Sequence, residues 1–213
     1  MANEIDPDVP ALITLFNSTF ADFQTQLVLG DDEPVYLPAS NDIPFHRIVF
    51  AHGFFSSALH EVAHWCVAGE KRRLLEDYGY WYCPDGRDAK QQAEFESVEI
   101  KPQAIEWAFT EAAGRQFQVS TDNLNGAEPD RQGFTKNVEA QLAWYKKHGF
   151  PPRAARFIDA LARCFNHCSI PDFPASSELG SGLNSKPTLN ANVVCCADPQ
   201  LETRPEITSS AES

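Results

Sequence analysis

The sequence predicts a mixed α/β (α+β) fold in a single compact domain, and three observations support this. Several segments repeat apolar residues every three or four positions, which is the spacing of a helix with one buried face. Short runs rich in β-branched and aromatic residues lie among them and are typical of strands. The chain has 213 residues, 43% of them hydrophobic and 15 of them Phe, which is enough for one substantial core.

Helix and strand are predicted to alternate in the first part of the chain. Residues 9–28 repeat apolar side chains at helical spacing up to Gly30, so one long helix is expected there. Residues 35–38 and 46–51 have the composition of short strands.

The next helix is expected after the turn His52-Gly53. Ser56 or Ser57 can cap its start. Apolar residues surround most of its circumference, which predicts a buried helix.

Proline and glycine set the predicted boundaries further along. Residues 89–98 have helical composition, and Pro102 predicts the first turn of a separate helix that ends at Gly114. Residues 117–120 are a candidate strand.

Two more helices complete the predicted domain. One covers residues 136–148 and ends at Gly149, and the other begins at Pro152. The last part of the chain has no aromatic residue and is rich in Ser, Gly, Asn, Pro and Glu, a composition that does not support a packed core. We therefore expect a folded domain over residues 1–173 and a disordered tail over residues 174–213.

Composition narrows the functional classes. The net charge of −13 argues against a nucleic-acid-binding surface, which is normally basic, and suits a cationic partner. No apolar run approaches the ~18 residues of a membrane span, and the first residues lack the basic and apolar parts of a signal peptide. We expect a cytoplasmic protein with reduced cysteines that binds neither nucleic acid nor membrane.

The central motif is His60-Glu61-x-x-His64 within the predicted buried helix. Side chains four residues apart lie one above the other on a helix, so His60 and His64 can bind one metal ion. Such short motifs also occur by chance. However, two histidines on a buried helix need polar partners, because unpaired buried polar groups are costly. The motif therefore predicts a metal site.

Two metal chemistries fit the motif. In a zinc hydrolase, Glu61 is the general base for a metal-bound water. In a non-haem iron oxygenase, two histidines and one carboxylate hold one face of Fe(II) and leave the other face open. The spacing on one helix by itself slightly favours zinc.

Either chemistry needs a third ligand further along the chain. Glu99 is our choice, because Val98 and Ile100 flank it with apolar side chains and indicate partly buried surroundings; Glu96 is the reserve. A third hypothesis is a non-enzymatic binding protein with a closed structural metal site. Such a site needs a fourth ligand, for which His52 is the candidate.

A more specific signal comes from longer strings of residues. These are Gly30–Pro38, Arg47–Gly53, His60–Cys66, Val98–Gln103 and Tyr80-Trp-Tyr-Cys-Pro-Asp-Gly-Arg-Asp88. Together they closely resemble the bacterial elongation factor P hydroxylase family, and the resemblance extends over about residues 10–172.

The resemblance implies a metal-dependent hydroxylase whose substrate is elongation factor P carrying a β-lysyl group on its modified lysine. It also implies a small mixed sheet packed with helices, similar to the fold of the zinc-dependent endoribonuclease of ribosomal RNA maturation. The family's two-His-one-carboxylate site carries over to His60, His64 and Glu99, which would hold Fe(II), with zinc or another divalent metal as a substitute and dioxygen as cosubstrate. Glu61 would then support a ligand or a metal-bound water.

The resemblance also directs attention to substrate binding. A lysine-rich substrate arm is cationic, and an acidic enzyme attracts it. Asp85, Asp88 and the acidic residues 31–33 are candidates to bind its ammonium groups. Tyr80 or Tyr82 is a candidate to pack against its methylene stem.

Overall fold

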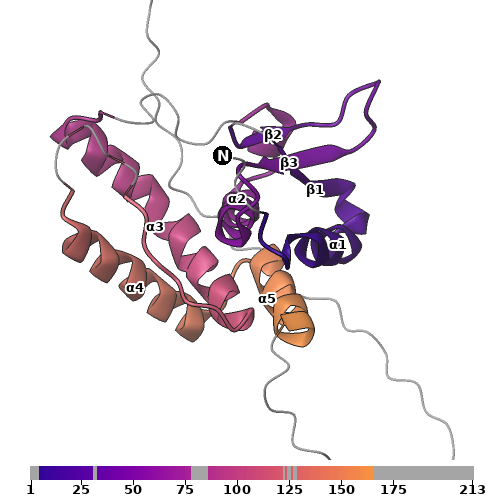
Figure 1. Ribbon diagram of the computed structural model, residues 1–213. Helices are drawn as coiled ribbons and strands as arrows, with labels where there is room; N and C mark the ends of the chain where they lie inside the picture. Colours follow the sequence, from indigo (N-terminus) through magenta and orange to yellow (C-terminus); the bar gives the residue numbers. More distant parts are fainter. Residues whose placement is uncertain are drawn as a thin grey trace, which may run out of the picture. The chain divides into compact units, whose positions relative to one another are not determined.

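The protein combines five α-helices with a three-stranded sheet in the part that the structure, a computed structural model, describes (Figure 1). The mixed α+β prediction is confirmed. The specific likeness to the endoribonuclease fold and the domain boundary at residue 173 stay predictions. No helix among the described residues is long and apolar enough to cross a membrane. The described residues are 5–30, 33–77, 86–121, 123, 126 and 129–165.

Some predictions concern residues outside the described part of the chain. The predicted tail, residues 174–213, lies outside the described residues. The same holds for five candidate substrate-binding residues, Asp31, Asp32, Tyr80, Tyr82 and Asp85.

The sheet is mixed and has the order β1-β3-β2. β1 (Thr25–Leu29) pairs in parallel with β3 (His46–Phe50), and β2 (Val35–Leu37) pairs with β3 in antiparallel orientation. Leu27 on β1 lies opposite Ile48 on β3, and both side chains are buried. The strands predicted at 35–38 and 46–51 are thus present, each one residue shorter.

The long helix predicted over residues 9–28 is wrong in its second half. α1 (Val9–Thr19) is followed by a 3-10 turn (Ala21–Phe23), and Gln24 has a positive φ of 49° that directs the chain into β1. Thr25 and Leu27 are buried alternately, as in a strand. Over so short a segment, apolar residues fit helical and strand periods equally well, and the pairing with β3 decides between them.

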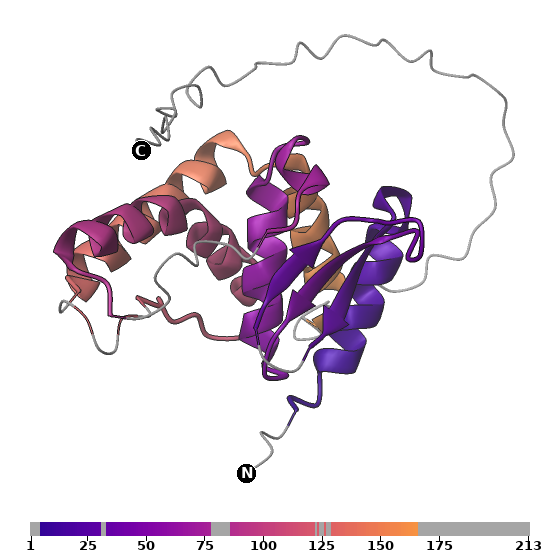
Figure 2. The same ribbon diagram turned by 90° about the horizontal axis from the view of Figure 1, so that it is seen from above.

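The turn after β3 forms as expected, with positive φ at both His52 (64°) and Gly53 (69°). It leads into α2 (Phe55–Val67), whose N-cap is Phe54 without a side-chain bond. The expected capping by Ser56 or Ser57 is therefore wrong, because the helix begins before both. α1 and α2 pack against the sheet, and α5 (Pro152–Phe165) lies between them (Figure 2).

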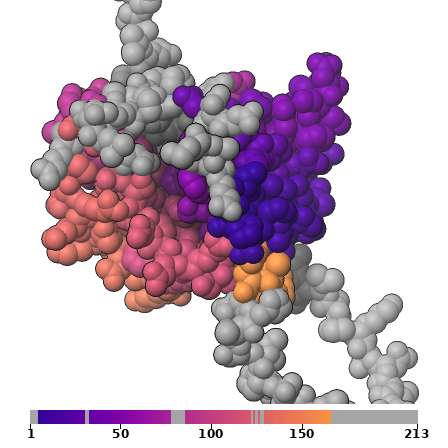
Figure 3. All heavy atoms as spheres, in the orientation of Figure 1, coloured from indigo at the N-terminus to yellow at the C-terminus, as the bar shows by residue number. Residues whose placement is uncertain are grey.

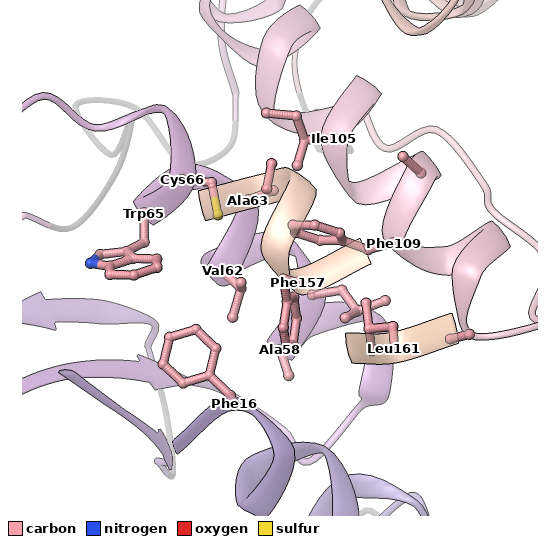
Figure 4. Close-up of a cluster of buried hydrophobic side chains, with 14 of the residues drawn as sticks. Phe16, Ala58, Val62, Ala63, Trp65, Cys66, Ile105, Phe109, Phe157 and Leu161 are labelled. Atoms are coloured by element: carbon pink, nitrogen blue, oxygen red, sulfur yellow. The ribbon is translucent and has the colours of Figure 1, made fainter. Parts of the chain in front are cut away.

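An aromatic cluster forms the centre of the core (Figure 4). The ring of Phe157 on α5 lies 5.6 Å from that of Phe16, 5.9 Å from that of Phe20 and 5.1 Å from that of Phe109. Trp65 on α2 contacts Phe16 edge-on at 5.5 Å. In the space-filling view, atoms of α5 (orange) lie directly below the N-terminal segment (indigo) (Figure 3). The cluster fixes α2 relative to its neighbours.

α3 (Ala89–Ala112) is one continuous helix, so the prediction of a separate helix starting near Pro102 is wrong. A proline inside a helix removes one backbone hydrogen bond and costs about 3 kcal/mol. Pro102 is nevertheless buried, and α3 packs along its length on α2, α4 and α5. This packing holds both halves of α3 in one helix, and the site depends on that continuity.

The remaining elements differ from expectation in detail. Residues 117–120 form no strand. α4 (Arg131–His148) begins five residues earlier than predicted, because Asp130 caps it by accepting a hydrogen bond from the Gly133 amide at 2.9 Å. α5 begins at Pro152 as predicted.

Candidate metal centre

α2 presents His60 and His64 on one face, one turn apart. Their Nε2 atoms lie 3.1 Å from each other. Both side chains are partly exposed, at 26% and 22%, so the pair lies at the edge of the core and is open on one side. α2 thus brings the two histidines together, as their four-residue spacing predicts.

α3 brings Glu99 to the two histidines. Its Oε1 lies 3.1 Å from His64 Nε2, and its Oε2 lies 3.6 Å from His60 Nε2. The Glu99 side chain is 3% exposed. One ligand atom from each of the three residues lies within 4.8 Å of the others, which is a spacing that one metal ion can bridge.

The donor set fits a divalent metal. At metal–ligand bonds of about 2.1 Å, neighbouring ligand atoms are about 3 Å apart, as the atoms of His60, His64 and Glu99 are. The lone pairs of two imidazole nitrogens and a carboxylate directed at one point repel each other unless a proton or a metal ion lies between them. Imidazole and carboxylate together suit zinc and iron.

Glu106, which was not predicted from the sequence, contacts the Nδ1 side of the His60 ring. Its Oε2 lies 2.8 Å from His60 Nδ1, and its side chain is only 10% exposed. With a proton on Nδ1 donated to Glu106, Nε2 keeps its lone pair for a metal ion. Hydrogen bonds of this kind orient metal-binding histidines and raise their basicity.

Glu99 and Glu106 belong to a buried polar stripe on α3. The stripe consists of Glu99, Gln103, Glu106 and Thr110, spaced by four, three and four residues. Gln103 joins it to the loop beyond α3, because its Nε2 donates to Ser120 O at 2.8 Å and its Oε1 accepts from the Ser120 amide at 3.1 Å. This spacing by three and four residues is visible in the sequence, and it is the pattern that could have indicated that Glu106 lies on the same helix face as Glu99.

The charges of the site lower the pKa of Glu99 and raise the pKa of His60. Burial by itself raises the pKa of Glu99, but the nearby His64 and His60 lower it to about 2. Burial by itself lowers the pKa of His60, but the hydrogen bond to Glu106 and the surrounding carboxylates raise it well above its usual range. The protein without metal therefore favours an anionic Glu99 beside a protonated His60.

Glu61 lies beside this cluster and lines a pocket. The pocket beside His64 is lined by Glu61, His64 and Trp65 on α2, by Ala68 just after α2, and by Tyr36 and Ile48 of the sheet. Burial raises the pKa of Glu61. Glu61 is not one of the three residues in the cluster, so its predicted support of a ligand or bound water stays a prediction.

Other candidates lie apart from the cluster. Glu96 is half-buried and accepts a hydrogen bond from Gln92 Nε2 at 2.9 Å. His52 is an exposed turn residue. Asp88 caps α3 in a capping box with Gln91 and lies about 16 Å along the helix axis from Glu99. Its proposed contact with substrate stays a prediction.

Replacing Glu106 by glutamine is expected to weaken metal binding about 10- to 100-fold, the usual effect of removing such a hydrogen-bonded partner. A neutral amide accepts a weaker hydrogen bond from His60 Nδ1 and can also present its NH₂ group to that nitrogen. Anaerobic titration with cobalt(II), followed by its visible absorption, measures the affinity. Glu111→Gln, an exposed change on the same helix, is the matched control. Equal affinities for Glu106→Gln and wild type would contradict the role of Glu106.

Acid is expected to destabilise the metal-free protein through Glu99. Its pKa is about 2 in the folded protein against an ordinary value of 4.5, so the unfolded chain binds this proton more readily. The stabilisation is complete above pH 4.5 and is lost as the pH falls towards 2. It amounts to about 3 kcal/mol. Urea unfolding in the presence of a chelator at several acidic pH values measures it, and Glu99→Gln should lack this part of the pH dependence.

Comparison with known proteins gives two matches. The sequence model of a family described as elongation factor P hydroxylase matches residues 15–172, which include every residue of the cluster and Glu106. A curated protein of Haemophilus influenzae, named elongation factor P lysine hydroxylase, is 50% identical over 156 residues, which span 73% of this chain and 88% of that protein.

Proposed function

Because the chain belongs to the elongation factor P hydroxylase family, we propose that it hydroxylates a lysine of elongation factor P. In the full proposal, this lysine carries a β-lysyl group, the metal is Fe(II), and dioxygen is the cosubstrate. The proposal includes a cytoplasmic enzyme, because its substrate is a translation factor. The net charge of −13 favours approach of a cationic substrate over nucleic acid.

The observation that carries the proposal is the convergence of His60, His64 and Glu99 beside a pocket. Among the described residues, no fourth His, Cys, Asp or Glu joins this cluster. Two histidines and one carboxylate on one face of a metal leave positions for dioxygen and substrate. A structural metal site would be closed by four protein ligands, so the geometry favours an enzyme over a metal-stabilised binding protein.

The roles of the residues follow from their contacts. Iron(II), when bound, supplies activation of dioxygen for the insertion of one oxygen atom into a C–H bond, and a reductant provides the electrons that reduce the second atom to water. Glu106 keeps the His60 proton on Nδ1 and so directs Nε2 to the metal position. Gln103 donates to Glu99 Oε2 at 3.4 Å and helps to fix the carboxylate. The pocket beside His64 admits the substrate side chain.

The alternative is a zinc-dependent hydrolase with Glu61 as general base, and the position of Glu61 in the pocket beside His64 supports it. The family membership favours the hydroxylase. The two functions differ in products: a hydroxylase adds oxygen to its substrate, whereas a hydrolase cleaves it.

The experiment is to incubate β-lysylated elongation factor P with anaerobically prepared Fe(II) enzyme, a reductant and air, and then to measure the substrate mass. The expected result is a gain of one oxygen atom that requires both iron and air. Unmodified elongation factor P is the control for the β-lysyl group. An unchanged substrate with a range of reductants, together with Glu61-dependent cleavage by the zinc-loaded protein, would overturn the proposal.

A further inference from the structure

Among the described charged side chains that line the pocket beside His64, Glu61 differs from the others in its hydrogen bonding. Arg72 is paired with Asp77, and Arg73 donates to Ala68 O at 2.9 Å. His64 is paired with Glu99. In the described part of the chain, Glu61 makes no hydrogen bond or ion pair, although the charges of the neighbouring His60 and His64 act on its carboxylate. The Glu61 carboxylate is therefore open to a hydrogen-bond donor on an occupant of the pocket, and an ammonium group is such a donor.

The position of Glu61 relative to the cluster is fixed by α2. Glu61, His64 and Trp65 follow the spacing i, i+3 and i+4, so they form one stripe along the pocket. Glu61 is thus one turn before His64, beside the candidate metal centre. The neighbouring wall consists of Trp65, Ile48 and Tyr36, whose apolar surfaces suit the methylene chain of a lysine.

Glu61 is not required to complete the metal site. The three ligand atoms of the cluster come from His60, His64 and Glu99, and Glu61 is adjacent in sequence to His60 on the same helix. Neighbouring residues on a helix point about 100° apart, so Glu61 faces the pocket when His60 faces Glu99 and Glu106. Its carboxylate is therefore free to contact a substrate group that occupies the pocket.

We propose that Glu61 binds an ammonium group of the substrate's lysyl side chain and so positions the adjoining methylene groups at the metal. This inference rests on the proposed function, because it takes the cationic substrate from it. Glu61 is then a substrate-binding and specificity-determining residue, in place of the general base of a hydrolase or a support for a metal-bound water. Charge-assisted hydrogen bonds between ammonium and carboxylate are among the stronger ones in proteins.

The test compares two forms of elongation factor P, one with the β-lysyl group and one with the same acyl group lacking its amino groups. Binding to cobalt(II)-loaded enzyme is measured by anaerobic calorimetry, so that no turnover is needed. Glu61→Gln is expected to weaken binding of the charged form about 10- to 100-fold. For the form without amino groups, wild type and Glu61→Gln should bind within about twofold of each other, because the ammonium contact is missing. Glu70→Gln, an exposed change just after α2, is the charge-matched control and should behave as wild type.

The outcomes separate the two proposals. If wild type does not hydroxylate the charged form, the proposed function fails and this inference falls with it. If wild type hydroxylates and Glu61→Gln binds both forms as wild type does, only the inference is overturned. A loss of kcat with unchanged substrate affinity, an altered cobalt(II) spectrum, or an equal loss of affinity for both forms would each overturn it as well.

Discussion

Glu99→Ala is expected to abolish metal binding and hydroxylation, whereas Glu96→Ala leaves both intact. Glu99 contributes the only carboxylate oxygens near both histidine Nε2 atoms within the described cluster, at 3.1 and 3.6 Å. Its removal should raise the metal Kd by more than about 100-fold. Replacing a residue that only hydrogen-bonds to a ligand usually costs up to about 100-fold, and loss of a ligand itself should cost more. Anaerobic cobalt(II) titration and the substrate mass measurement give both readouts.

Glu96→Ala is the matched control, since it removes the same group three residues earlier on the same helix. The Glu96 carboxylate is held by Gln92, so its loss affects the start of α3 and not the metal position. His60→Ala and His64→Ala should behave like Glu99→Ala. A metal-free Glu96→Ala protein combined with a metal-loaded Glu99→Ala protein would reverse the assignment of the third ligand.

Phe157→Ala is expected to lower the free energy of unfolding by about 3–5 kcal/mol. The Phe157 ring is fully buried and contacts rings on α1 and α3, so its removal leaves a cavity where three helices meet. Domains of this size are stable by only about 5–15 kcal/mol, so the loss is a large share of the total. Urea unfolding followed by tryptophan fluorescence measures it.

Asp159→Ala, an exposed change two residues along α5, is the control and should change the stability by less than about 0.5 kcal/mol. At temperatures where Phe157→Ala stays folded, it should still bind cobalt(II), because α5 contributes no residue to the cluster. A fully stable Phe157→Ala protein would mean that the cluster in Figure 4 collapses to fill the cavity without loss.

The sequence by itself determined the half of the site that lies on one helix. His60 and His64 come together because side chains at i and i+4 share a face in any α-helix, whatever surrounds it. The turn at His52-Gly53 and the strand before it were also predictable, because they depend on local backbone preferences. The ligand roles of these histidines stay predictions.

The burial of Glu99 could be predicted from the sequence, but its physical cause could not. Glu99 is buried, as expected, at 2% exposed. Its apolar neighbours do not explain this burial, because Val98 is 46% exposed. Burial of Glu99 follows from the face of α3 that packs on α2, and adjacent residues on a helix do not share that face.

The tertiary structure alone decided which groups from distant segments meet. Glu106 was missed because a glutamate in a helical pattern is normally taken as solvent-exposed, whereas here the stripe with Glu99 and Gln103 faces the histidines of α2. It meets them only because α3 continues through Pro102, against the local preference of proline. Local sequence fixes contacts within a turn or a helix face. Contacts between helices depend on packing energies summed over the whole core, and these can override the preference of any single residue.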